Sequence, residues 1–305
     1  MDVKKEPMGD KAPAPEPIQW LGDAIGGSDL LGGKAASIDR LARLGVATPP
    51  GFCITTDAFR RELLDGPMHD AAAHALAALP DEGARLALTA LAIDAPLTRA
   101  FGAALTASLD RLNSAASFGT DGPVQLAVRS SAVGEDGAFA SFAGMHDTEL
   151  GLTRDDVEPA VRRCWASLWS DRAMGYRQLR GLPLDGGAMA VVVQVLVPAS
   201  AAAVVFTRHP VTGRADQVLV NAVIGLGDSI VSGDVTPDMY VVEKHGLALC
   251  EREVAGQGAL DDRQLRELTE LSLHIEDRFG QPVDLEAAYA GGLWYLLQAR
   301  PITTH

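Results

Sequence analysis

The stretch VDLEAAYAGGLWYLLQARPITT, residues 283–304, has the pattern of a β-hairpin in which two strand-like segments flank a tight Ala-Gly-Gly turn. Asp284 and Glu286 are two residues apart, so their side chains share one face of the sheet. Gln298 and Arg300 share a face for the same reason. Carboxylate and amide oxygens on adjacent strands suit a Mg²⁺ ion that bridges phosphates, and Arg300 could neutralise charge during a transfer. The alternative is a half-exposed hairpin whose charged side chains face water.

Further strand patterns precede this hairpin and extend back to residue 123. The expected strands are 124–129, 145–150, 188–196, 202–206, 216–222, 238–243, 282–289 and 293–298. Apolar residues at helical spacing predict helices over 154–180 and 261–279. The second part of the chain is therefore expected to be rich in β-structure.

The first part of the chain has a different pattern. Short strands are expected at Ile18–Leu21 and in the segment FCITT, which begins at Phe52. Thr56 or Asp57 is expected to cap the helix that follows. Ala- and Leu-rich sequence over 70–112, interrupted by two prolines, predicts two or three packed helices.

Together these patterns predict an α+β protein with two lobes. The expected division is a helix-rich N-terminal lobe over residues 18–122 and a β-rich C-terminal lobe over residues 123–305. Residues 1–17 contain four prolines and many charges, so we expect a disordered lead-in there. Clefts between lobes are common ligand sites, which makes the boundary the first place to expect function.

Composition excludes several classes of function for this chain of 305 residues. Its net charge of −14 argues against a broad nucleic-acid interface, which needs a basic face, although a local basic pocket could still bind an anion. Cys53, Cys164 and Cys250 lie far apart, which indicates neither a disulfide framework nor a structural zinc site. The sequence has no run of 18 apolar residues, so we expect a cytoplasmic protein without a membrane partner.

Gly32-Gly33-Lys34 places a lysine in the first turn of an expected helix, after two flexible residues. Backbone N–H groups at a helix start and a nearby ammonium group together favour a phosphate. The full Walker pattern is absent, so this is not a P-loop. A glycine turn followed by a solvated lysine explains the motif equally well.

Arg129 ends the apolar strand QLAV, where a guanidinium group could bind a phosphate through two hydrogen bonds. The loop over residues 130–144 that follows is rich in Ala, Gly and Ser, so its backbone could approach a polyphosphate closely. The alternative role for Arg129 is an ion pair between lobes with Glu135 or Asp136.

Several segments, in a fixed order, resemble the nucleotide-binding (ATP-grasp) domain of the phosphoenolpyruvate synthase, pyruvate phosphate dikinase and rifampicin phosphotransferase family. The segments are LGGKAASIDRLARLGVATPPGFCITTDAF, AVRSSAVGEDGAFASFAGMHDT, CWASLWSDRAMGYR, VVVQVLVPASAAAVVFTRHPVTG, IGLGDSIVSGDVTPDMY and VDLEAAYAGGLWYLLQARPITT. The resemblance extends from about residue 18 to residue 304 and implies a two-lobed ATP-grasp fold with the nucleotide between the lobes.

The resemblance implies ATP and Mg²⁺ as cofactors and gives a role to each matched position. Lys34 and Arg129 would hold ATP phosphates, and the turn over 141–144, which ends at Gly144, would cover them with Thr148 nearby. Gln194 would lie near the adenine. The hairpin positions follow the same pattern: Glu286 and Gln298 would bind Mg²⁺, Arg300 would face the phosphates, and Asp284 would support them.

The chain also departs from the family at three positions. Relatives often have an acidic residue before the Gly-Leu-Gly loop and a glutamate just after it, where this chain has Asn221 and Asp228. Met145 stands where the synthase branch usually has glutamine and the dikinase branch can have methionine. These departures leave the substrate branch open.

Full-length relatives continue into a swivelling domain with a phosphorylated histidine and then an acceptor domain, and none of the seven histidines here has the expected Gly-Gly-x-x-Ser/Thr-His-Ala context. The resemblance therefore implies an ATP half-reaction in which the two terminal phosphates of ATP pass to a histidine, leaving AMP. That histidine would lie on a separate protein or on C-terminal domains that this sequence lacks. The alternatives are a stand-alone kinase or ligase that acts on a small molecule and releases ADP, and a non-catalytic nucleotide-binding module.

Overall fold

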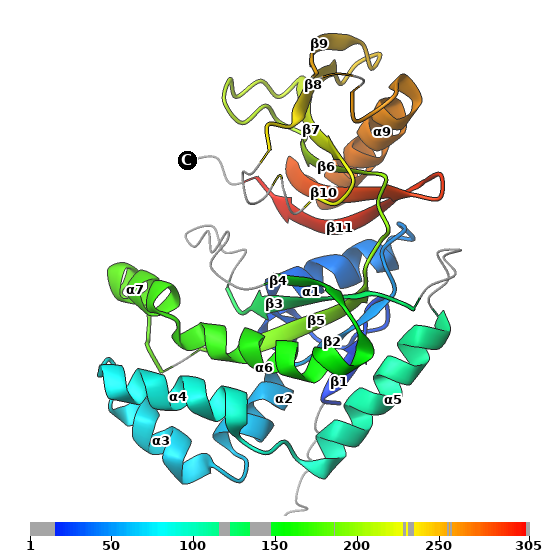
Figure 1. The fold of residues 1–305 in the computed structure, drawn as a ribbon. Helices are drawn as coiled ribbons and strands as arrows, with labels where there is room; N and C mark the ends of the chain where they lie inside the picture. The colour runs from blue at the N-terminus through cyan, green and yellow to red at the C-terminus, as the bar shows by residue number, and fades with distance from the viewer. Residues whose placement is uncertain are drawn as a thin grey trace, which may run out of the picture.

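Two antiparallel sheets organise the chain, as the computed structural model shows (Figure 1). The structure describes residues 16–115, 123–134, 148–185, 187–227, 230, 235–254, 256 and 258–302. The five-stranded sheet has the order β1-β2-β5-β3-β4, and the six-stranded sheet has the order β11-β10-β6-β7-β8-β9. The expected α+β, two-lobed architecture is confirmed.

The strands of the two sheets follow one another along the chain. The first sheet comprises β1 (Ile18–Trp20), β2 (Gly51–Ile54), β3 (Leu126–Ala132), β4 (Thr148–Leu152) and β5 (Met189–Val195). The second comprises β6 (Ala201–Phe206), β7 (Gln217–Ile224), β8 (Asp238–Glu243), β9 (Leu249–Glu253), β10 (Val283–Ala290) and β11 (Leu293–Pro301). Of these, β9 has no counterpart among the expected strands, because all five of its residues are exposed and show no alternation of apolar and polar side chains.

The division between the lobes does not fall at residue 122, where the sequence patterns placed it. Strands β3, β4 and β5 belong to the first sheet, because Gln194 of β5 is the register partner of both Gly51 in β2 and Ala127 in β3. The chain passes to the second sheet between Val195 and Ala201. Sequence periodicity locates strands but does not identify their neighbours, which explains the difference.

Helices cover both faces of the first sheet. They are α1 (Ser28–Arg43), α2 (Thr56–Phe59), α3 (His69–Ala77), α4 (Glu82–Asp94), α5 (Arg99–Ala115), α6 (Val157–Ala166) and α7 (Asp171–Arg180). Alternate residues of β5 face opposite sides: Val191 and Val193 pack in the cluster that contains α6, whereas Ala190 and Val192 pack against α1. Trp165 of α6 is fully buried in the larger cluster.

The helix expected over 154–180 is broken into two. Its apolar residues, including Val161 and Trp165, are buried as expected. However, Ser170 adopts an extended backbone and its hydroxyl accepts a hydrogen bond from Ala173 N at 3.2 Å, so it caps α7 as a separate helix. A serine inside an apolar-periodic stretch was the local signal for this break.

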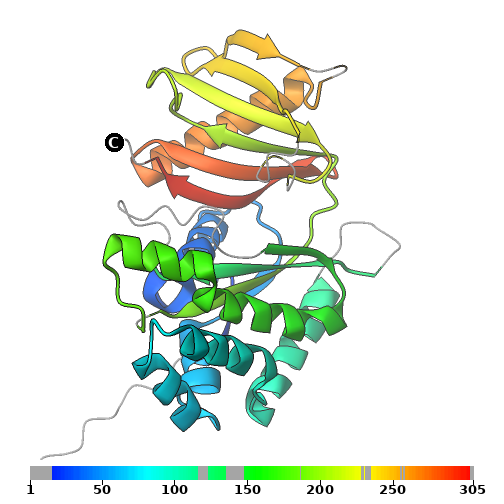
Figure 2. The ribbon, with the colours of Figure 1, turned by 60° about the vertical axis from the view of Figure 1, so that its left-hand side comes forward.

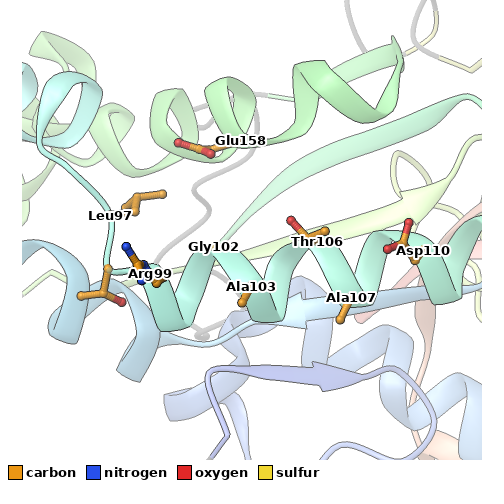
Figure 3. Close-up of a pocket in the computed structure, with 9 residues that line it drawn as sticks. Leu97, Arg99, Gly102, Ala103, Thr106, Ala107, Asp110 and Glu158 are labelled. Atoms are coloured by element: carbon orange, nitrogen blue, oxygen red, sulfur yellow. The ribbon is translucent and has the colours of Figure 1, made fainter.

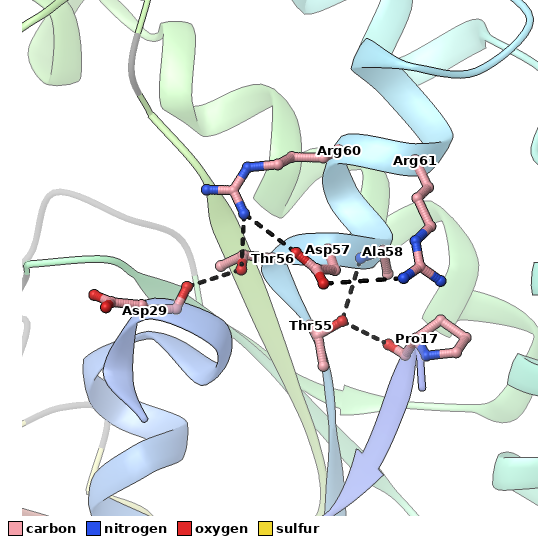
Figure 4. Close-up of polar contacts among 8 residues, drawn as sticks. All are labelled: Pro17, Asp29, Thr55, Thr56, Asp57, Ala58, Arg60 and Arg61. Atoms are coloured by element: carbon pink, nitrogen blue, oxygen red, sulfur yellow. Dashed lines mark hydrogen bonds and ion pairs between the residues drawn. The ribbon is translucent and has the colours of Figure 1, made fainter. Parts of the chain in front are cut away.

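The cap of α2 is Thr55 and not Thr56 or Asp57, as Figure 4 shows. The Thr55 hydroxyl accepts from Ala58 N at 3.2 Å. The hydroxyl of Thr56 instead donates to Asp29 O at 2.8 Å and so joins α2 to the start of α1. Thr56 was misassigned because two adjacent threonines have equal capping propensity, and only the tertiary contact distinguishes them.

The second sheet has its own core beneath α9 (Asp262–Phe279), which lies against one face of the sheet in both views (Figures 1 and 2). Leu268 and Ile275 of α9 are fully buried and pack with Val283 and Leu285 of β10. The predicted apolar face of this helix is confirmed. Its packing leaves the opposite face of β10 and β11 available to the first lobe.

Candidate functional site between the lobes

The start of α1 is broken at Gly32, whose φ of 70° and ψ of 172° are readily adopted only by glycine. A Cβ atom at Gly32 would lie 2.0 Å from the carbonyl oxygen of Ser131 in β3. The fully buried Ser131 hydroxyl donates to Leu31 O at 2.8 Å and accepts from Ala35 N at 3.0 Å. Ser131 thus satisfies backbone groups at the break and fixes the start of the helix on β3.

Lys34 lies in the first turn after this break, as the sequence predicts. The helix begins earlier than expected, because Ser28–Leu31 form a further turn before the break at Gly32. The side chain of Lys34 is partly exposed. Its role as a phosphate ligand stays a prediction.

Arg129 lies in β3, two residues before Ser131, and its side chain reaches the second lobe. Its guanidinium donates to Leu297 O at 3.5 Å and lies 3.9 Å from Oε2 of Glu286. The Arg129 and Glu286 side chains are only 14% and 29% exposed. An inter-lobe ion pair therefore exists, but with Glu286; Glu135 and Asp136 lie outside the described residues.

Thr148 is the register partner of Arg129 and is the exposed first residue of β4. The structure therefore brings Thr148 next to Arg129, as the resemblance implies. Gly144 and the rest of the expected 141–144 turn lie outside the described residues, as does Met145.

The C-terminal hairpin has the predicted strands and the predicted shared face. Glu286 is the register partner of Gln298, and Asp284 is that of Arg300. A β-bulge interrupts the ladder after Glu286, so Leu297 is the extra residue and has no register partner in β10. The carbonyl oxygen of Leu297 is the group that accepts from Arg129.

Asp284 and Arg300 form a close ion pair, with both Nε and one terminal nitrogen of Arg300 at 2.7 Å from Oδ2 of Asp284. Burial raises the pKa of Asp284, and the positive charge and hydrogen bond of Arg300 oppose that rise. Arg300 keeps a partly exposed side chain, at 39%. Asp284 therefore orients Arg300 while leaving part of its guanidinium accessible.

The face of the hairpin that carries these charges is apolar at its other end. Ala288 and Ala290 of β10 form a small buried cluster with Val197, and Tyr295 and Leu297 pack against it. This cluster lies beside the 196–200 connection between the sheets. The face thus changes from apolar near the connection to charged near the end of the chain.

Gln194 is placed at the end of β5, next to this connection, as expected. Its side chain is 3% exposed, and its amide nitrogen donates to Pro49 O at 3.2 Å. Gln194 is therefore already engaged with the segment between α1 and β2. A direct contact with adenine stays a prediction.

Of the two departures near the Gly-Leu-Gly loop, Asn221 lies in β7 and Asp228 lies outside the described residues. Asn221 and Glu286 are both register partners of Val204 in β6, so they occupy one row across the sheet. The row places Asn221 on the same face as the charged hairpin residues. Asn221 thus lies two strands away from Glu286 on the face that carries the predicted metal ligands.

The donor set at the hairpin fits a Mg²⁺ ion that is held partly by nucleotide phosphates. Among the described residues, no group of three or more His, Cys, Asp and Glu side chains could hold a metal ion alone. Mg²⁺ commonly takes one or two protein oxygens and completes its shell with phosphates and water. Glu286 and Gln298, as cross-strand neighbours, would supply such a pair.

A separate surface groove of about 610 Å³ lies on the outer helical side of the first lobe (Figure 3). It is bordered by Gly102, Ala103, Thr106 and Asp110 of α5 and by Glu158 of α6. None of the predicted site residues borders it. We place the functional site between the lobes, because the charged groups converge there and not in this groove.

Comparison with known families matches the chain to the pyruvate phosphate dikinase AMP/ATP-binding domain over residues 28–258 and 249–305. The chain is 33% identical over 320 residues to a probable phosphoenolpyruvate synthase from Methanocaldococcus jannaschii, covering 94% of this chain and 27% of that protein. It is 37% identical over 312 residues to a rifampicin phosphotransferase from Streptomyces sviceus, covering 90% of this chain and 34% of that protein.

A third relative is the prodigiosin synthesizing transferase PigC from Serratia marcescens, which is 35% identical over 315 residues, with 94% of this chain and 33% of that protein covered. The chain therefore spans about a third of the length of these relatives. Among solved structures, D-alanine–D-alanine ligase from Helicobacter pylori aligns over 89% of this chain and 54% of its own, with a TM-score of 0.37 and 10% identity.

The described residues contain no single helix that is long and apolar enough to cross a membrane. In the same described ranges, α4 and α5 taken together, across a bend of 59°, meet the length and composition of a span.

Proposed function

The chain belongs to the pyruvate phosphate dikinase AMP/ATP-binding domain family, and we propose that it carries out the ATP half-reaction of a dikinase-type phosphotransferase. In this reaction a histidine nitrogen attacks the β-phosphorus of ATP. The bond from that phosphorus to the oxygen bridging the α- and β-phosphates breaks, AMP leaves, and the histidine loses its proton. The protein contributes position and charge neutralisation.

The observation that carries this proposal is the meeting of Arg129 with Glu286 between the lobes. A cation from the first sheet lies 3.9 Å from a carboxylate of the second, directly across from Gln298. In such an arrangement Arg129 can bind a phosphate, and Glu286 can bind a cation that the phosphates also hold. Mg²⁺ would supply charge shielding there, held by Glu286 and Gln298.

The change from apolar to charged side chains along the hairpin face supports one orientation of the nucleotide. The partly exposed Tyr295 and Leu297 that pack on the apolar cluster suit a base, and the charged end with Arg300 suits the phosphates. Arg129 and Lys34 would then contact the phosphates from the first lobe. In this arrangement Arg129 exchanges its contact with Glu286 for a contact with ATP.

The relatives' names and lengths support a histidine acceptor outside this sequence. The matched part is 27% of a phosphoenolpyruvate synthase and 34% of a rifampicin phosphotransferase. We propose that the pyrophosphoryl group passes to a histidine-bearing domain, encoded with this chain or supplied by another protein.

The test is product analysis with ATP labelled at the β-phosphate. The chain is incubated with Mg²⁺ and the labelled ATP, with and without the remaining two thirds of the S. sviceus rifampicin phosphotransferase as acceptor. AMP together with label on the acceptor supports the proposal. ADP with no labelled protein would instead favour a kinase that acts directly on a small molecule.

Two arginine variants, one at the site and one as a matched control, test the role of Arg129. Arg129→Gln should abolish most labelling, because it removes a phosphate ligand. Arg263→Gln should not, because Arg263 lies on α9, is 72% exposed and pairs with Glu267 one turn along the same helix. Equal labelling by both variants would contradict the role of Arg129.

A further inference from the structure

The outer edge of β11 is one of the surfaces through which the second lobe contacts the first. β11 is the edge strand of its sheet, so one row of its backbone groups has no neighbouring strand. Leu296 N donates to Ala47 O at 2.9 Å, and Leu297 O accepts from Arg129. Three different segments of the first lobe cover this edge, and the third contact is made by α1.

Ser37 of α1 makes that third contact with both backbone groups of one residue. Its hydroxyl accepts from Ala299 N at 3.2 Å and donates to Ala299 O. One hydroxyl can do both, since it has one donor and two acceptor sites. Ala299 lies between Gln298 and Arg300, the two residues of β11 whose side chains enter the site.

Lys34 and Ser37 are three residues apart on α1. Residues at this spacing are neighbours on one face of a helix, so Lys34 lies one turn from Ser37 on the face that meets β11. Figure 1 shows α1 directly beneath β11. Among contacts within the part of the chain that the structure describes, the Ser37 contact is therefore the link between lobes that lies nearest to Lys34 along the helix.

Other contacts hold α1 to the two lobes at a distance from Lys34. Leu41 is buried in the core of the second lobe, and Arg40 donates to Arg278 O at 3.2 Å and stacks on Phe279. The break at Gly32 fixes the start of the helix on the first sheet. Loss of the Ser37 hydroxyl would therefore leave both lobes folded and attached, and would affect mainly the alignment of Lys34 with β11.

We propose that Ser37 is a positioning residue for the triphosphate: it sets the distance between Lys34 on the first lobe and Gln298 and Arg300 on the second. The inference rests on the proposed placement of ATP between the lobes. A ligand whose phosphates contact both lobes binds only the fraction of molecules in which the two are aligned, so a lower fraction weakens its apparent affinity. AMP lacks the two terminal phosphates and does not require this alignment.

The test compares Ser37→Ala, Ser37→Thr and Ser272→Ala in the 305-residue chain. Dissociation constants for Mg-ATP and for AMP are measured by calorimetry, and thermal unfolding is followed without ligand. Ser272 is a suitable control, because its buried hydroxyl donates to Leu268 O within α9 and makes no contact between the lobes.

We expect Ser37→Ala to weaken Mg-ATP binding about tenfold, the effect of losing one hydrogen bond of ordinary strength. Its AMP affinity and unfolding temperature should match those of Ser272→Ala. Ser37→Thr retains the hydroxyl and should recover most of the Mg-ATP affinity.

Two results would overturn the inference while leaving the proposed function intact. The first is Mg-ATP affinity in Ser37→Ala equal to that in Ser272→Ala. The second is an equal loss of affinity for both nucleotides together with a lower unfolding temperature, which would indicate a structural role alone. Failure of the unaltered chain to bind Mg-ATP would instead refute the proposed function and the inference with it.

Discussion

The two lobes contribute different side chains to the proposed site and hold them by different means. The first lobe contributes two cations, Lys34 and Arg129. Lys34 follows the glycine break in α1, where the buried Ser131 hydroxyl forms hydrogen bonds with the backbone groups of the break. The second lobe contributes Glu286 and Gln298, which are placed by strand register and a bulge. Backbone geometry therefore controls the proposed phosphate side, whereas cross-strand pairing controls the proposed metal side.

This difference determines what a substitution should do on each side. A change at the break acts on the backbone of a buried contact between α1 and β3, so it should affect folding. A change on the hairpin face removes a partly exposed side chain from an intact ladder, so it should affect chemistry more than stability.

Gly32→Ala should have the largest effect. The alanine would adopt a backbone conformation that side chains disfavour, and its Cβ would lie 2.0 Å from Ser131 O. We expect a loss of about 3 kcal/mol or more in the free energy of unfolding, measured by urea denaturation.

Gly102→Ala is the matched control for that substitution. Gly102 lies inside α5 with no atom within 4 Å of the position of a Cβ atom, so alanine there should stabilise the chain by up to about 1 kcal/mol. If both variants had similar stability, the break at Gly32 would not be required by the fold.

Glu286→Ala should have the next largest effect, and on a different measurement. We expect Mg²⁺-dependent ATP turnover to fall about 100-fold or more, because a metal ligand is lost at the transferred phosphates. Most of the ATP affinity measured without Mg²⁺ should remain, since Arg129 is then released from its ion pair.

Glu267→Ala removes a glutamate that pairs with Arg263 on the surface of α9 and should leave turnover unchanged. Full activity in Glu286→Ala would refute the metal role and with it the contrast between the two lobes.

Asp284→Asn should have the smallest effect, which appears as a change in pH dependence. Because burial raises the pKa of Asp284, the folded state binds more protons than the unfolded state just above the unfolded value of about 3.9. The unfolding free energy of the unaltered chain should therefore fall, relative to that of the variant, as the pH rises from 4 through the folded-state pKa.

Urea denaturation between pH 4 and pH 7 would measure this difference, with the exposed Asp277→Asn as control. The opposite slope would mean that the ion pair with Arg300 outweighs burial, and that the pair is a source of stability on the metal side.

Individual elements show which structural features could be predicted from sequence patterns. The hairpin that carries Glu286 and Gln298 was predicted with the correct shared faces, because strand periodicity is two and the turn is marked by two glycines. The helix α9 was predicted for a similar reason, since its apolar residues recur at helical spacing.

Other elements depended on contacts that no local pattern reveals. The break between α6 and α7 and the cap at Thr55 were missed, because each is decided by one hydroxyl and its backbone contact. Ser37 and Ser131 gave no signal as isolated serines. Each acquires its role only from a residue far away in the chain, Ala299 for the first and Leu31 for the second.

The sequence by itself determined the kinds of most elements, the residues that share a face of the hairpin and of α9, and the membership of the family. Those properties follow from local periodicity and from matched segments in a fixed order. The tertiary structure alone decided that the lobes divide between Val195 and Ala201, and that Arg129 meets Glu286 rather than an acid in its own loop. The reason is physical: strand pairing and lobe contacts join residues more than 100 positions apart, and a side-chain period specifies a face without specifying what covers it.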